Sequence, residues 1–216
     1  SLDLQSDYLA ASQATTCPVK FAVTSPYMLA KTLLNHHYRN MEELTWAIAK
    51  VLRCQIARID APFIQIDEAH LPGSIDDYAL AADTINHILE AAPHQTGVHL
   101  CFGNYGGQTI QEGNYEKLLP FFNTLQCDFL LLEFARRNRE SIALFQDLKP
   151  SLRLGIGVID IKDLEIETPD LIARRIEHAV QKLGAERVHW IHPDCGFWML
   201  PRTVADQKMQ ALVKGR

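Results

Sequence analysis

The sequence has no uninterrupted apolar run of the roughly 18 residues that a transmembrane helix needs. Its first seven residues contain neither the basic region nor the apolar core of a signal peptide. The chain has no low-complexity segment and no basic stripe, and its formal net charge is −5 over 216 residues. These absences argue against a membrane protein, a secreted protein and a nucleic-acid binder.

Cysteine is also scarce and is not arranged as in a disulfide scaffold. The chain has five cysteines, an odd number, and no CxxC pair. In a chain of this length the pattern favours a reducing, cytoplasmic setting. We interpret Cys17, Cys54 and Cys127 as ordinary small apolar or buried positions.

Short apolar runs alternate with helical stretches along the whole chain. Strands are predicted at residues 19–24, 63–66, 98–101, 129–132, 153–159 and 188–191. Helices are predicted at 41–58, 75–91, 115–125, 141–148, 168–183 and 203–213. This alternation predicts an α/β fold with a parallel sheet.

Six such units are two fewer than an eight-stranded (β/α)8 TIM-type barrel contains. Residues 2–13 would then be the tail of a helix that belongs to an absent unit. The alternatives are the C-terminal portion of a longer barrel protein and an open doubly wound sheet. We favour the barrel, with residues 1–216 as a single catalytic domain that lacks its first two units.

Four polar residues lie at or near the carboxyl ends of predicted strands, namely His99, Cys101, Glu133 and Cys195. Because the carboxyl ends of parallel strands point at one common mouth, we expect these residues to converge. One imidazole, one carboxylate and two thiolates form a tetrahedral donor set that suits zinc. A thiol substrate bound to zinc becomes a thiolate at neutral pH. The pattern therefore predicts a zinc cofactor and thiol alkylation.

Simpler interpretations of these residues remain open. His99 and Cys101 are two residues apart on a strand and share one face, which would also suit two ordinary core side chains. Glu133 could be a solvent-exposed strand end, although an unpaired carboxylate would be costly to bury after its apolar run. Arg136, Arg137 and Arg139 form a basic cluster that either attracts a polyanionic folate tail or begins a solvated helix; we favour the helix.

Several motifs occur together and in a fixed order, at residues 64–68, 99–101, 133, 157–160 and 193–196. In this combination the chain resembles the catalytic barrel of cobalamin-independent methionine synthase, within the larger group of uroporphyrinogen decarboxylase-like barrels. The resemblance runs from about Pro18 to the C-terminus. It implies a (β/α)8 barrel with zinc held by the four residues named above, and it implies that Asp67 binds the amino group of homocysteine. It also implies an S-methyltransferase that moves a methyl group from a methyl-folate to homocysteine and forms methionine.

The sequence departs from the family pattern at positions that concern the methyl donor. Lys162 stands where methionine synthases of this family have a histidine that is their proposed proton donor. Ala69 replaces a proline, Gly73 falls at a folate-contacting glutamate, and Thr32 falls near a folate-stacking tryptophan. The zinc chemistry therefore carries over better than the donor does. A methyl-corrinoid donor, coenzyme M as the thiol, and a catalytically incomplete zinc-binding fragment are the alternatives.

Asp160 and Lys162 are the candidate catalytic residues besides the metal ligands. Asp160 would orient a ligand or a neighbouring group. Lys162 would protonate the leaving group or would be an ordinary solvated loop lysine, and we favour the solvated interpretation. The expected partners are small molecules, with no nucleic acid and no membrane, and the sequence leaves the oligomeric state open.

Overall fold

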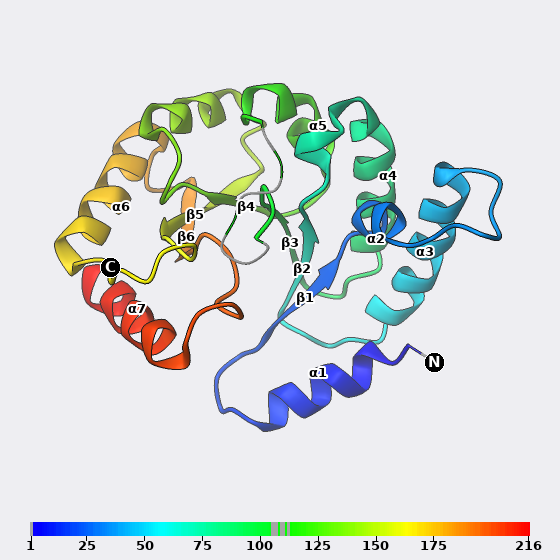
Figure 1. The fold of residues 1–216 in the computed structure, drawn as a ribbon, viewed down its shortest axis with the longest axis horizontal. Helices are drawn as coiled ribbons and strands as arrows, with labels where there is room; N and C mark the ends of the chain where they lie inside the picture. Colours follow the sequence, from blue (N-terminus) through cyan, green and yellow to red (C-terminus); the bar gives the residue numbers. More distant parts are fainter. Residues whose placement is uncertain (1, 105–107, 109–110, 112) are drawn as a thin grey trace. The chain divides into compact units, whose positions relative to one another are not determined.

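A computed structural model describes residues 2–104, 108, 111 and 113–216. Its sheet has six strands whose order follows the chain, from β1 to β6 (Figure 1). The strands are β1 (Lys20–Thr24), β2 (Phe63–Glu68), β3 (Gln95–Leu100), β4 (Phe129–Glu133), β5 (Arg153–Ile159) and β6 (Val188–Pro193). The pairs β1–β2, β4–β5 and β5–β6 are parallel, as the alternation of strands and helices predicts.

Helices connect the strands throughout the described residues. They are α1 (Leu4–Gln13), α2 (Pro26–Thr32), α3 (Met41–Ile56), α4 (Tyr78–Leu89), α5 (Leu119–Thr124), α6 (Pro169–Leu183) and α7 (Arg202–Gly215). Four 3-10 helices add η1 (Leu71–Gly73), η2 (Ile75–Asp77), η3 (Glu116–Leu118) and η4 (Arg139–Asp147). No helix in this described part of the chain is long and apolar enough to cross a membrane.

The chain divides into two compact units, and the division falls inside β3 after His99. The first unit comprises residues 1–99 and 117–128. Its helices α3 and α4 pack side by side (Figure 1). Leu52 and Ile56 of α3, and Ile85 and Ile88 of α4, are spaced so that each pair lies on one face of its helix. These apolar faces are buried.

The second unit comprises residues 100–116 and 129–216. Strand β4 is buried at every position, which is why it appears in the sequence as a continuous apolar run. Helices α6 and α7 pack against each other (Figure 1). The strand ends of this unit carry Glu133, Asp160 and Cys195.

Local capping signals explain where the helices begin and end. Thr168 accepts the N–H of Leu171 at 3.2 Å, Pro169 is the first residue of α6, and Gly184 ends the helix at φ 88°. The sequence predicted this helix, but it did not predict α2, where Ser25 and Pro26 form the same signal. The helix predicted at 141–148 is wrong in type, because residues 139–147 form the 3-10 helix η4.

Candidate metal and substrate site

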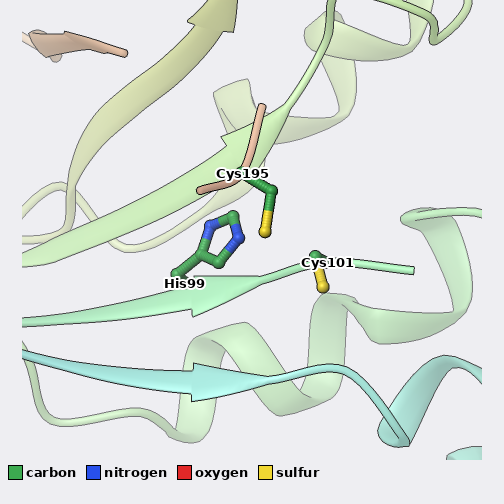
Figure 2. A group of neighbouring side chains, drawn as sticks. All are labelled: His99, Cys101 and Cys195. Carbon is green, nitrogen blue, oxygen red and sulfur yellow. The ribbon is translucent and has the colours of Figure 1, made fainter. Parts of the chain in front are cut away.

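Three of the four predicted ligand residues lie close together. His99 is in β3, Cys101 follows the end of that strand, and Cys195 follows β6. One ligand atom from each lies within 4.8 Å of the others. Figure 2 shows the His99 ring pointing toward the Cys195 sulfur. Two thiols and an imidazole at this spacing are a donor set that fits Zn²⁺.

The protonation of Cys101 reflects these close contacts. Its pKa is raised first by a hydrogen bond with Cys195, then by burial, and then by the negative charges of Cys195 and Glu133. Negative charge and sulfur ligands are thus concentrated in a buried position. A divalent cation is the partner that such a set of groups accommodates, because it would stabilise both thiolates.

Glu133, the fourth predicted ligand, ends β4 and is 3% exposed. Its main chain is fixed by the Tyr115 hydroxyl, which accepts the Glu133 N–H at 2.9 Å and donates to the Glu133 carbonyl at 3.0 Å. Its carboxylate oxygen Oε2 lies 3.7 Å from Lys162 Nζ and 3.8 Å from Arg137 Nη2. The structure therefore places Glu133 between two cations and near Cys101, outside the group of three, and its role as a ligand stays a prediction.

Both cations correct an interpretation made from the sequence. The side chain of Lys162 is 5% exposed, so the solvated interpretation is wrong. Arg137 does not lie on a solvated helix face either, since its guanidinium carbon lies 3.4 Å from the centroid of the Phe102 ring. The cluster prediction fails at Arg137 alone, since Arg136 and Arg139 are exposed and Arg139 begins η4. Sequence alone cannot show that Lys162 and Arg137 turn back toward a buried carboxylate.

Asp160, the other predicted catalytic residue, holds the turn that follows β5. Its Oδ1 accepts the backbone N–H of Lys162 at 2.8 Å, and its Oδ2 pairs with Nε of Arg136 at 2.5 Å. The Asp160 N–H donates in turn to Glu167 at 2.7 Å. Asp160 therefore holds the backbone of Lys162, and its predicted catalytic role stays a prediction.

Asp194 is a site residue whose role sequence reasoning missed. It is buried, and its Oδ1 accepts the N–H groups of Phe134 and Ala135, each at 3.0 Å. Its pKa is raised to about 7, first by burial and then by the negative charges of Glu133 and Asp160, against the lowering effect of these two hydrogen bonds. Asp194 thereby ties the Cys195 loop to the end of β4. The only signal in the sequence is its position directly before the cysteine.

Gly157 in β5 leaves the space that Asp194 occupies. A Cβ atom at this position would lie 2.2 Å from Asp194 Oδ1 and 2.9 Å from the Leu132 carbonyl oxygen. No side chain fits there without moving Asp194. The absence of a side chain at Gly157 thus allows Asp194, and with it the Cys195 loop, to pack directly against β5.

Asp67, the predicted substrate anchor, lies at the carboxyl end of β2 in the first unit. It pairs with Thr24 of β1, and its carbonyl accepts the Ser25 N–H at 2.9 Å. Its carboxylate oxygen Oδ1 accepts from Gln65 Nε2 at 2.6 Å. The neighbouring Glu68 is buried and accepts the N–H groups of His70 and Leu71. Its role is thus to hold the chain after β2.

The fold and the site together define an α/β domain of the barrel type with a candidate thiol-based metal centre at its strand ends. Residues 4–215 match the family described as cobalamin-independent synthase, catalytic domain. The chain belongs to this family.

Curated relatives and solved structures agree with the family. The chain is 30% identical over 200 residues to a methionine synthase of Thermococcus kodakarensis, covering 91% of the chain and 56% of the relative. It is 29% identical over 209 residues to a methionine synthase of Sulfurisphaera tokodaii, covering 95% and 58%. The chain thus spans less than two thirds of the relatives' length.

Solved structures show the same fold. The chain superposes on a B12-independent methionine synthase from Shewanella sp. W3-18-1, solved with selenomethionine, with a TM-score of 0.86 and 23% identity. The alignment covers 100% of this chain and 66% of that one. A putative vitamin-B12-independent methionine synthase from Listeria monocytogenes gives a TM-score of 0.73 at 20% identity, covering 99% and 68%. These likenesses confirm the predicted (β/α)8-type fold, of which this chain carries six strands.

Proposed function

We propose that this chain is the catalytic part of a zinc-dependent S-methyltransferase that methylates the thiol of homocysteine to form methionine, with a methyl-folate as donor. The observation that carries the proposal is the approach of His99, Cys101 and Cys195 within 4.8 Å in a member of this family. The site thiols must stay reduced to bind metal, so the proposed setting is the cytoplasm.

In this proposal His99, Cys101, Cys195 and Glu133 would hold a zinc ion. Bound there, the ion would supply the positive charge that stabilises a substrate thiolate at neutral pH, where a free thiol with a pKa of about 8.5 is mostly protonated. Asp67 accepts the ammonium group of homocysteine and so fixes the direction in which the sulfur approaches the donor. Its carbonyl is held by Ser25 and its carboxylate by Gln65, which supports the role of a fixed anchor.

Lys162 is the proposed proton donor for the leaving group. Its amine group is a proton-donating side chain, it is shielded from water, and Asp160 fixes the backbone of the residue. Its Nζ lies 3.7 Å from Glu133 Oε2, which places the lysine beside one of the predicted zinc ligands. Lys162 thus stands where the family has a histidine, and its side chain is also a proton-donating group.

Turnover of Cys195→Ser with homocysteine and methyl-tetrahydrofolate tests the proposal. Loss of one thiolate ligand should lower the rate by at least about 100-fold, because weaker changes around metal ligands already cost 10- to 100-fold. Cys54→Ser is the matched control, since Cys54 is exposed on α3. Near-normal turnover of Cys195→Ser would refute the zinc-thiolate mechanism.

The identities of the methyl donor and of the thiol need a separate comparison. Lys162 replaces the histidine that is the proposed proton donor in this family, and this difference concerns the reaction with the methyl donor. Methyl-tetrahydrofolate and a methyl-corrinoid are supplied in parallel, each with homocysteine and with coenzyme M. We expect turnover with homocysteine and the methyl-folate. Turnover with coenzyme M alone would replace homocysteine as the substrate, and zinc binding without any turnover would mark the chain as catalytically incomplete.

A further inference from the structure

A line of polar side chains lies on one face of the β1–β2 pair and ends at Asp67. Lys20 pairs with Phe63, Ala22 with Gln65 and Thr24 with Asp67 in the parallel register. Because side chains two residues apart on a strand share a face, Gln65 and Asp67 lie on the same face, and Lys20 lies on the matching face of β1. All of these residues belong to the first unit.

Two hydrogen bonds connect the three side chains. Lys20 Nζ donates to Gln65 Oε1 at 2.7 Å, and Gln65 Nε2 donates to Asp67 Oδ1 at 2.6 Å. An ammonium group can only donate and an ionised carboxylate can only accept. The Gln65 amide therefore has one permitted orientation, with its oxygen toward Lys20 and its nitrogen toward Asp67.

This arrangement constrains the Asp67 carboxylate. Gln65 is buried and Asp67 is partly buried, so their hydrogen bond is partly shielded from water, and a hydrogen bond to a charged carboxylate is stronger than one between neutral groups. Lys20 is exposed and is linked to Asp67 by the side-chain amide of Gln65. The carboxylate of Asp67 is therefore already oriented by the Gln65 amide before a substrate ammonium group binds to it. A side chain that is already oriented loses less conformational entropy when the substrate binds, so the binding free energy is more favourable.

We infer that Lys20 and Gln65 are positioning residues that orient Asp67 and make the site selective for thiols that carry an amino group. The inference rests on the proposed function, in which Asp67 binds the ammonium group of homocysteine. It adds two residues that act through Asp67 and do not touch the thiol.

The test compares homocysteine with 4-mercaptobutanoate, which is the same molecule without its amino group. Binding of each thiol to the zinc-loaded protein is measured by calorimetry under reducing conditions. Gln65→Leu should weaken homocysteine binding by about tenfold and leave 4-mercaptobutanoate binding unchanged, since one charge-assisted hydrogen bond is lost. Lys20→Met should weaken homocysteine binding by a smaller factor and also leave 4-mercaptobutanoate binding unchanged. Lys20→Arg should bind homocysteine as the wild type does.

The two-ligand design separates this inference from the proposed function. A wild-type protein that binds both thiols equally would overturn the role of Asp67 itself. A wild-type preference for homocysteine that survives intact in Gln65→Leu would overturn the positioning role alone. A variant that loses both ligands equally would show a structural role and would also contradict the inference. Lys50→Met, at an exposed position of α3, is the control and should bind both thiols as the wild type does.

Discussion

At the scale of single residues, the candidate metal centre depends on neighbours that do not themselves bind metal. Asp194 joins the Cys195 loop to the backbone of Phe134 and Ala135, and it can do so because Gly157 has no side chain. The Cys195 loop is therefore held in place by Asp194, and the absence of a side chain at Gly157 of β5 makes room for this contact. Supporting contacts of this kind commonly decide metal affinity as much as the ligands do.

Gly157→Ala tests this dependence. The added Cβ would lie 2.2 Å from Asp194 Oδ1, so Asp194 must move and its two hydrogen bonds to the β4 end weaken. We expect zinc affinity to fall by 10-fold or more, and the free energy of unfolding to fall by about 1–3 kcal/mol. Competition with a chromophoric chelator measures the affinity, and denaturant titration measures the stability.

Gly196→Ala is the matched control on the other side of Cys195. Its added Cβ would meet no atom closer than 3.8 Å, from the Trp198 ring, which is an ordinary contact. Zinc affinity close to wild type is expected there. Equal losses in the two variants would mean that the loop tolerates no change at all, and the specific role of Gly157 would be refuted.

The sequence predicted some of these residues and could not predict others. The spacing of His99 and Cys101 places both on one strand face, and the apolar run before Glu133 makes a buried carboxylate a notable feature. Burial of Lys162 depends on how the loop after β5 folds back toward Glu133, and no local pattern encodes that path. The role of Asp194 is likewise visible only once β4 and the Cys195 loop are in contact.

At the scale of elements, a buried ion pair fastens α7 to the segment that precedes α6. Lys208 of α7 is fully buried, donates to the Glu165 carbonyl, and pairs with Glu167 Oε2 at 2.9 Å. The other oxygen of Glu167 accepts the Asp160 N–H and lies 3.7 Å from Arg175 Nη1. The same carboxylate therefore connects the packing of two helices with the turn that carries Lys162.

Lys208→Met should destabilise the protein by about 2–4 kcal/mol, because Glu167 would stay buried after losing its closest cation. Equilibrium unfolding in urea measures the change. Lys214→Met, at an exposed position near the end of α7, should change stability by no more than about 0.5 kcal/mol. If Lys208→Met unfolded at the same urea concentration as the wild type, the pair would have no part in holding α7.

Element boundaries followed from the sequence wherever a capping signal stood beside a clear apolar pattern. Helix α6 has both, with Thr168 and Pro169 at its start and Gly184 at its end. Helix α2 has the Ser25 and Pro26 signal, but its seven residues are too few to show a helical period. The 3-10 geometry of η4 could not be predicted, since spacing does not distinguish it from an α-helix over nine residues.

At the scale of the whole chain, strand order follows the sequence, and each candidate residue lies at or just after the carboxyl end of a strand. Asp67 belongs to β2, His99 to the end of β3, and Glu133 to β4, while Cys101 directly follows β3. The alternation of strands and helices was enough to predict this arrangement, because carboxyl ends carry the site in folds of this type. The chain spans 56% and 58% of the length of two curated relatives.

Elemental analysis of the purified protein measures whether His99, Cys101 and Cys195 hold a metal ion, as proposed. We expect about one zinc per chain in the wild type and in Cys54→Ala. Cys101→Ala should lose that zinc, because a donor set of this kind does not retain zinc after losing a thiolate. A wild-type protein without zinc, or a Cys101→Ala variant with the wild-type zinc content, would contradict the proposed metal site.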